Sequence, residues 1–190
     1  IKARSYEVDI LRIDICKKNP FPSFRSTADF NGSKCLNLFK ANAISNRINL
    51  DKDSKFNISD LKPNDQLIGQ YKFLAMTLKN KFSISGEYNT GGIIYKTGPK
   101  GPKDIIIDKT NNKPSKFSEK LTNWRGKKNK DNRYCKQGGT PSRCDLNYNG
   151  IKLTAIGLNK DYFETYGDKT KYIFYTSEFP SPITINEKSK

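Results

Sequence analysis

The feature that most constrains the fold of this chain is that its apolar residues come in short runs separated by turn residues. Runs such as IGQYKFLAMTL (68–78), IKLTAIGL (151–158) and KYIFYTS (171–177) are rich in Ile, Tyr, Phe and Thr, which favour the pleated surface of a sheet. Ala and Leu, the main helix formers, are together less frequent in the chain. Short strands at such intervals predict an all-β fold, either a β-sandwich or a jelly roll.

Shorter apolar pieces predict further strands, at CLNLF (35–39), RINL (47–50), GGIIYKT (91–97), KDIIID (103–108) and PITIN (182–186). The run KFSISGEY (81–88) follows the strand at 68–78 closely. We therefore expect a hairpin that turns through Lys79, Asn80 and Lys81.

The first strand, expected over Ser5–Cys16, alternates strictly but changes phase in its middle. Its apolar residues lie on one face up to Ile10 and on the opposite face from Leu11 onward. A bulge or a crossing between two sheets would let both sets face a core, and burial on both sides is the alternative. Insertion into a neighbouring subunit's sheet would also supply the second surface. The candidate assembly strand consists of Tyr6, Val8, Ile10, Leu11, Ile13 and Ile15.

Four cysteines allow three disulfide pairings. We expect cysteines that are adjacent in the sequence order to pair, Cys16 with Cys35 and Cys135 with Cys144, because each pair flanks a polar loop that a disulfide would close. The first bridge would contribute about 3 kcal/mol through loop closure. A zinc site is the weaker alternative, since the close spacing of C-x-x-C is missing, and free cytosolic thiols are the third.

The chain begins with Ile1 rather than Met, and it has no apolar stretch of the roughly 20 residues that cross a bilayer. A cleaved export signal accounts for this start and for the cysteines together, whereas a truncated sequence accounts for the start alone. We therefore expect an extracellular or cell-surface protein, exported with signal-peptide cleavage and without a membrane span.

The length of 190 residues fits one domain over 1–190, and residues 109–145 form a long polar insertion with the second cysteine pair near its end. Within it, PSKFSEKLTNW (114–124) has the spacing of a short helix with Phe117, Leu121 and Trp124 on one face. An irregular loop pinned by Trp124 is the alternative.

The same insertion is basic, and the whole chain carries a formal charge of +16. Cationic and aromatic residues interleave in LTNWRGKKNKDNRYCK (121–136), a pattern that suits an anionic polysaccharide or single-stranded nucleic acid. A solvated loop is the simpler alternative, since Lys far outnumbers the Arg that specific nucleic-acid readers use. The candidate polyanion contacts are Trp124, Arg125, Lys127, Lys128, Lys130 and Arg133.

The residue types argue against catalysis. With no His in the chain, Ser-His and Cys-His nucleophile systems and His-ligated metals are excluded, and no phosphate-binding glycine motif is present. Asp51, Asp53 and Asn57 begin like a calcium loop, but Lys55 stands at the third ligand position, which favours an ordinary turn. We expect a protein that is not an enzyme and needs no cofactor.

The opening SYEVDILRIDICKKNPF, the second Cys in NGSKCLNL and the strands around QYKFLAMTLKNKFSISGEY resemble small exported β proteins of AT-rich bacteria. More broadly, the layout is similar to β-sandwich subunits of bacterial surface filaments. The resemblance implies a structural subunit of a filament, pilus-like fibre or surface layer, which forms a homopolymer through β-strand addition. A secreted cationic module that binds an anionic polymer and a phage or virion structural protein are the alternatives.

Overall fold

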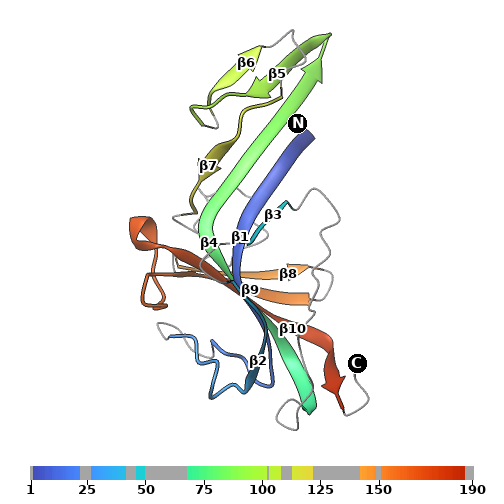
Figure 1. Ribbon diagram of the computed structural model, residues 1–190, viewed down its shortest axis with the longest axis vertical. Helices are drawn as coiled ribbons and strands as arrows, with labels where there is room; N and C mark the ends of the chain where they lie inside the picture. The colour runs from blue at the N-terminus through green and yellow to red at the C-terminus, as the bar shows by residue number, and fades with distance from the viewer. Residues whose placement is uncertain are drawn as a thin grey trace. The chain divides into compact units, whose positions relative to one another are not determined.

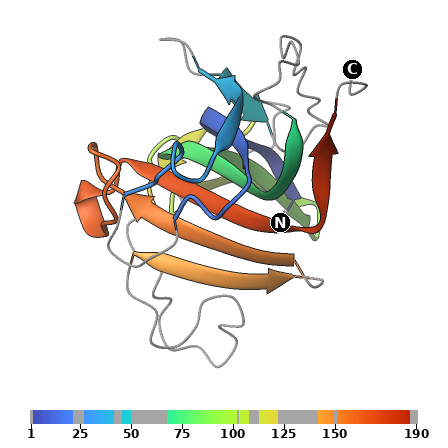
Figure 2. The same ribbon diagram turned by 90° about the horizontal axis from the view of Figure 1, so that it is seen from below.

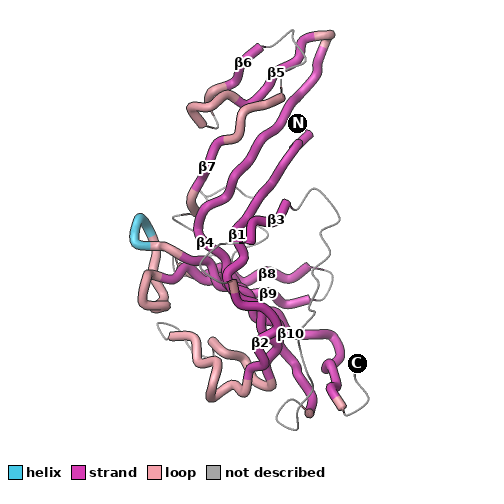
Figure 3. Tube along the Cα trace, in the orientation of Figure 1, coloured by secondary structure: helices cyan, strands magenta, loops and turns pink. Residues whose placement is uncertain are grey.

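The computed structural model describes residues 2–21, 27–41, 46–49, 68–101, 103–107, 113–121, 142–148 and 151–186. Nearly all of its regular structure is extended, and the strands build a large antiparallel sheet (Figures 1 and 3), so the all-β class is confirmed. In this part of the chain the only helix is a single 3-10 turn at Gly167–Lys169.

The strands are β1 (Lys2–Cys16), β2 (Cys35–Lys40), β3 (Asn46–Asn49), β4 (Gly69–Thr90), β5 (Ile93–Thr97), β6 (Ile105–Ile107), β7 (Phe117–Glu119), β8 (Arg143–Tyr148), β9 (Ile151–Leu158) and β10 (Tyr172–Ile185). Hydrogen bonding places them in the order β2-β1-β4-β10-β9-β8. In addition, β3 pairs with β1, β5 and β7 pair with β4, and β6 pairs with β5. Figure 2 shows β8, β9 and β10 side by side in orange to red.

The chain divides into two compact units, and the two long strands β1 and β4 contribute to both. The first unit contains β1 up to Asp9, β4 from Lys81, and the strands β3, β5, β6 and β7. The second contains β1 from Ile10, β4 up to Asn80, and the strands β2, β8, β9 and β10. The division of β1 falls one residue before the phase change in its apolar pattern.

The expected hairpin at Lys79–Lys81 is wrong, because β4 runs unbroken through these residues. Asn80 is 3% exposed, and its amide donates to the carbonyls of Leu121 and Thr170 and accepts from the Leu121 N–H. A buried amide with these partners is fixed in the sheet and is not a solvated turn residue.

The hairpin turn lies instead at Gly91 and Gly92, between β4 and β5. Their φ angles are 56° and 78°, and Thr90 pairs directly with Ile93. Two central residues with positive φ are what a two-residue hairpin loop needs to match the twist of its strands, and glycine adopts that conformation without strain.

The segment 114–124, whose spacing of apolar residues predicts a short helix, instead contains a strand at its centre. Phe117–Glu119 forms β7 and pairs with Phe82–Ile84 of β4, and the Phe117 side chain is 9% exposed. Non-local backbone pairing therefore overrides the helical spacing. Trp124 lies outside the described residues.

Two strands expected at 171–177 and 182–186 are one strand, β10. Its pairing with β4 is regular up to Glu178, resumes at Ile183 and is irregular between them. Pro180 and Pro182 lie in this interval, and proline cannot donate to a ladder, which explains the interruption.

The second unit has apolar clusters on both faces of its sheet. One is formed by Cys16, Phe21, Ala75, Ile156, Leu158 and Phe174, and the other by Ile15, Leu36 and Tyr71. Ile15 and Cys16 are neighbours in β1 and point to opposite faces, so this part of β1 is buried on both sides. The first unit buries Val8, Phe82 and Phe117, and Tyr6 stacks on Phe82 at 5.9 Å.

Candidate functional site

The candidate assembly strand lies inside the sheet. β1 has β2 and β4 as hydrogen-bonded neighbours, and all of these strands belong to the same chain. Val8, Ile10 and Ile15 are buried, while Tyr6, Leu11 and Ile13 are half-buried. Both apolar sets of β1 are therefore buried or half-buried, and β1 is paired with β2 from Arg12 to Cys16.

The expected bridge between Cys16 and Cys35 is confirmed, and the two residues are directly opposite in the pairing of β1 with β2. Cys144 is also disulfide-bonded and is 2% exposed. Cys135 lies outside the described residues, so its pairing with Cys144 stays a prediction. The polyanion candidates Trp124, Arg125, Lys127, Lys128, Lys130 and Arg133 and the calcium candidates Asp51, Asp53 and Asn57 lie outside them too.

Within the described ranges, no group of three or more Cys, Asp or Glu side chains is placed to hold a metal ion. The same residues include no helix long and apolar enough to span a membrane.

Described residues of the second unit line a pocket that has a varied set of side chains. Its volume is about 610 Å³, within the usual range for small-molecule sites. Segments far apart in the sequence contribute to it: β1, the stretch before β2, the end of β2, the loop after β9 and the start of β10. The side chains that give it chemical character are Arg12, Phe30, Lys40, Asp161, Tyr162 and Tyr172.

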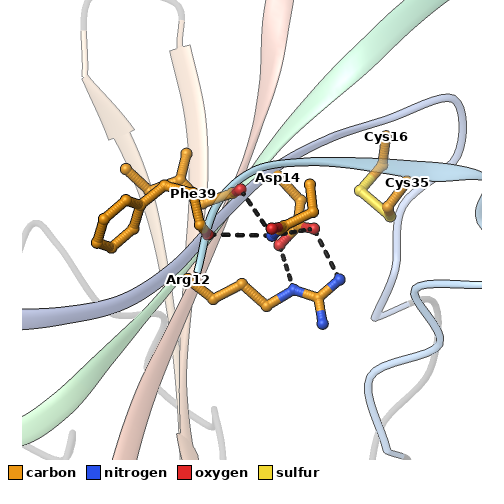
Figure 4. Close-up of polar contacts among 7 residues, drawn as sticks. Arg12, Asp14, Cys16, Cys35 and Phe39 are labelled. Carbon is orange, nitrogen blue, oxygen red and sulfur yellow. Dashed lines mark hydrogen bonds and ion pairs between the residues drawn. A yellow bond between two sulfur atoms is a disulfide. The ribbon is translucent and has the colours of Figure 1, made fainter. Parts of the chain in front are cut away.

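The Arg12 guanidinium is held on two sides. Its Nε and Nη2 donate to the two carboxylate oxygens of Asp14, at 2.6 and 2.7 Å (Figure 4). Asp14 is buried, and Asn37 also donates to it at 3.1 Å. The guanidinium carbon lies 3.8 Å from the centre of the Phe30 ring, a cation–π contact. These contacts fix Arg12 and Phe30 as parts of the pocket lining.

Tyr162 and Tyr172 form a second lining element. Their rings are stacked, with centroids 4.9 Å apart and an interplanar angle of 14°. Tyr162 is 40% exposed, so part of this aromatic surface faces solvent.

The loop that carries Tyr162 is a tight turn with an unusual residue. Tyr162 N–H donates to the Asn159 carbonyl at 3.2 Å, and Asn159 N–H donates to the Phe163 carbonyl at 2.9 Å. This is the bond pattern of a three-residue hairpin loop, in which the residue before the closing pair is left-handed and is usually glycine. Here it is Tyr162, with φ of 60°.

Other contacts hold this loop in place. The Asn159 side-chain oxygen accepts from the N–H groups of Asp161 and Phe163, at 2.8 and 3.0 Å. Phe163 also forms a bridge with Thr27, which lines the pocket. The turn is therefore organised before any ligand arrives.

A left-handed conformation costs a non-glycine residue about 1–2 kcal/mol. Backbone strain of this size is typical of functional sites, where the surrounding structure maintains it. At position 162 the strained residue supplies an aromatic ring to a pocket.

The pocket has mixed polarity. Burial and the neighbouring Tyr172 raise the pKa of Tyr162 above its ordinary value, and Arg12 opposes them by lowering it. The Tyr162 hydroxyl is therefore protonated at neutral pH and serves both as a donor and as an acceptor. Lys40 and Asp161 are exposed and carry opposite charges.

Sequence reasoning identified only Leu11 among the residues of this pocket, and for a different role. The signal for the loop was present, because Asn159 and Asp161 between two apolar runs are hairpin-loop residues. The left-handed Tyr162 and its stacking on Tyr172 depend on the tertiary structure.

A second exposed feature lies in the first unit. β6 pairs with β5, and the described residues provide no partner for its other side. Ile105, Ile106 and Ile107 are 60%, 39% and 61% exposed. Consecutive strand residues point to opposite faces, so this short edge is apolar on both.

No family model, curated protein or solved structure matches this chain.

Proposed function

We propose that this protein is a non-enzymatic binding protein of the cell exterior, and that the pocket in its second unit holds a ring of the ligand against aromatic side chains. The observation that carries the proposal is Tyr162, a residue with a left-handed backbone that stacks on Tyr172 and lines an open pocket with it. Backbone strain in a preorganised loop is typical of functional sites, so it favours a role of this loop in ligand binding over a role as an ordinary structural turn.

The pocket chemistry favours binding over catalysis. Asp161 is exposed, and the Asp14 carboxylate already accepts from Arg12 and Asn37. General acid–base catalysis needs a group with a pKa near neutrality, and glycosidase chemistry needs two facing carboxylates. The pocket lining offers Asp161 as its carboxylate, beside a tyrosine that stays protonated.

An extracellular location is part of the proposal. The Cys16–Cys35 bridge supports it, since stable disulfides belong mostly to oxidising compartments. The location and the binding role are separable properties of the protein.

The test is ligand-observed NMR with a panel of free monosaccharides, nucleosides and aromatic amino acids, on the native protein and on Tyr162→Gly. We expect the native protein to bind at least one of these ligand classes, and we expect the Tyr162→Gly variant not to bind that class. Stability should change little, because relief of about 1–2 kcal/mol of backbone strain offsets the lost aromatic pair, worth about 0.5–1.5 kcal/mol beyond its buried area.

The matched control is Tyr166→Ala, since Tyr166 is 59% exposed and does not line the pocket. It should bind as the native protein does. Equal binding by the native protein and by Tyr162→Gly contradicts the proposal, as does a panel in which nothing binds.

A structural subunit that assembles by β-strand addition is the second candidate, and β6 favours it. An edge strand of three exposed isoleucines is a template for pairing with a second copy, and natural proteins usually protect such edges. In this candidate the assembling strand is β6, because β1 already pairs with β2, β3 and β4 of its own chain.

Analytical ultracentrifugation tests the second candidate, at high salt so that the charge of +16 does not keep the copies apart. We expect the native protein to self-associate and Ile106→Lys to stay monomeric. Ile151→Lys is the control, since Ile151 on β9 is 40% exposed and Ile106 is 39% exposed. A native protein that is monomeric at every concentration, or equal effects of both variants, rules this candidate out.

A further inference from the structure

We infer that the ring held in the pocket is a neutral, hydroxyl-rich sugar ring, such as one unit of a polysaccharide. This inference rests on the proposed function and names its ligand class. It follows from the charge balance, the hydrogen-bonding groups and the aromatic surfaces of the pocket.

The charges at the pocket nearly cancel. Arg12 is the most enclosed cation, and Asp14 neutralises it through two hydrogen bonds. At the rim, the positive charge of Lys40 is matched by the negative charge of Asp161. Polyanion sites depend on several uncompensated cations that replace counterions, and this pocket does not offer them.

The hydrogen-bonding groups include both donors and acceptors. Arg12 uses Nε and Nη2 for Asp14, and a guanidinium has five N–H donors in total, so donors remain. Asp161 is a pure acceptor, and the protonated Tyr162 hydroxyl is both. Sugar hydroxyls also donate and accept, whereas a phosphate only accepts and is repelled by Asp161.

An aromatic side chain provides a flat surface that a ring can cover. Tyr162 stacks on Tyr172 through one face and is 40% exposed, whereas the Phe30 ring is already covered by the guanidinium of Arg12. A sugar ring has apolar C–H faces and a polar rim, so it can cover an aromatic surface while its hydroxyls meet the polar groups.

The pocket also opens to solvent. Thr27, Lys40 and Asp161 in its lining are exposed. A ring inside a longer chain can therefore enter while its neighbours stay outside. This favours a polysaccharide over a small molecule that must be enclosed.

The test is isothermal titration calorimetry at low and at high salt with three kinds of probe. These are neutral oligosaccharides (cellohexaose, maltohexaose and mannohexaose), an acidic one (oligogalacturonate) and a nucleic acid (oligo-dT). We expect a neutral oligosaccharide to bind with an affinity that salt changes less than about twofold, because no counterions are released. Tyr162→Gly should lower this affinity at least tenfold.

Asp161→Leu removes the acceptor without touching the aromatic stack. A hydrogen bond to a charged group is worth about 1.5–3 kcal/mol, so the affinity for the neutral sugar should fall roughly tenfold or more. The same change removes a negative charge, so binding of oligogalacturonate should not weaken. Tyr166→Ala is again the control, and should bind as the native protein does.

The outcomes separate the inference from the proposed function. If oligogalacturonate or oligo-dT binds and the neutral sugars do not, and Tyr162→Gly abolishes that binding, the inference is overturned and the pocket remains a binding site. If nothing binds, the inference is overturned, while the proposed function still depends on the NMR panel with nucleosides and aromatic amino acids. If a probe binds and Tyr162→Gly does not change its affinity, both are overturned.

Discussion

At the scale of single residues, the best-defined polar contact beside the pocket is the pair of Arg12 and Asp14. The two residues are two positions apart in β1 and so lie on the same face. The Asp14 side chain is 1% exposed and that of Arg12 is 28% exposed. Asn37 donates to Asp14 and also to the carbonyls of Ile13 and Phe39, so side chains as well as backbone hold β1 and β2 together.

We expect Asp14→Ala to lower the free energy of unfolding by about 3 kcal/mol, the low end for breaking a buried pair, since Arg12 keeps some contact with water. The double variant Arg12→Met with Asp14→Leu should be much closer to the native protein, because it leaves no unpaired charge. Urea unfolding measures both. Equal losses in the single and double variants would show that packing, and not the unpaired charge, sets the cost.

At the scale of elements, the two long strands β1 and β4 explain why the polar residues Lys79–Lys81 do not form the predicted turn. The polar residues Lys79–Lys81 interrupt an apolar pattern, and the phase of β1 changes after Ile10. Neither place is a turn. The division between the two units falls between Asn80 and Lys81 in β4 and between Asp9 and Ile10 in β1. A break in the apolar pattern can therefore mark where a strand passes from one unit to another while its backbone stays extended.

The true turn of β4 gives a prediction. A Cβ at Gly92 would meet nothing within 4 Å, so the cost of Gly92→Ala comes from the backbone alone. At φ of 78° we expect a loss of about 1–2 kcal/mol. Gly92→Asn should lose less, since Asn tolerates this conformation. Thermal unfolding compares the two variants, and equal losses would mean that this turn does not need positive φ.

At the scale of the whole molecule, a covalent bond and a strong charge act together. The chain carries a formal charge of +16, which opposes compaction through self-repulsion. The Cys16–Cys35 bridge joins β1 to β2 beside the main apolar cluster of the second unit. It also closes the stretch that contains Phe21 and Phe30, two aromatic residues that contact Phe174.

We expect the double variant Cys16→Ala with Cys35→Ala to lose about 3 kcal/mol of stability, because the bridge closes a loop with a sequence separation of 19. Guanidinium unfolding measures the loss, and its salt content screens charge repulsion equally in both proteins. Unchanged stability would show that strand pairing alone holds β1 and β2 together.

The local pattern of residues is sufficient to predict the all-β class, several strands and the first disulfide. The strand at 151–158 agrees with its apolar run, and Cys16 and Cys35 bracket a stretch short enough to close. These features could be predicted because alternation, β-branched residues and breaker residues act on the local chain.

The positions of Asn80 and Phe117, and the set of side chains that form the pocket, depend instead on contacts between distant segments. Asn80 stays in a strand because the carbonyls of Leu121 and Thr170 accept hydrogen bonds from its side-chain amide. The pocket unites Arg12, Phe30 and Tyr162, which are far apart in sequence. Strand pairing, ring stacking and a strained backbone depend on partners distant along the chain, and a local pattern does not encode which partners those are.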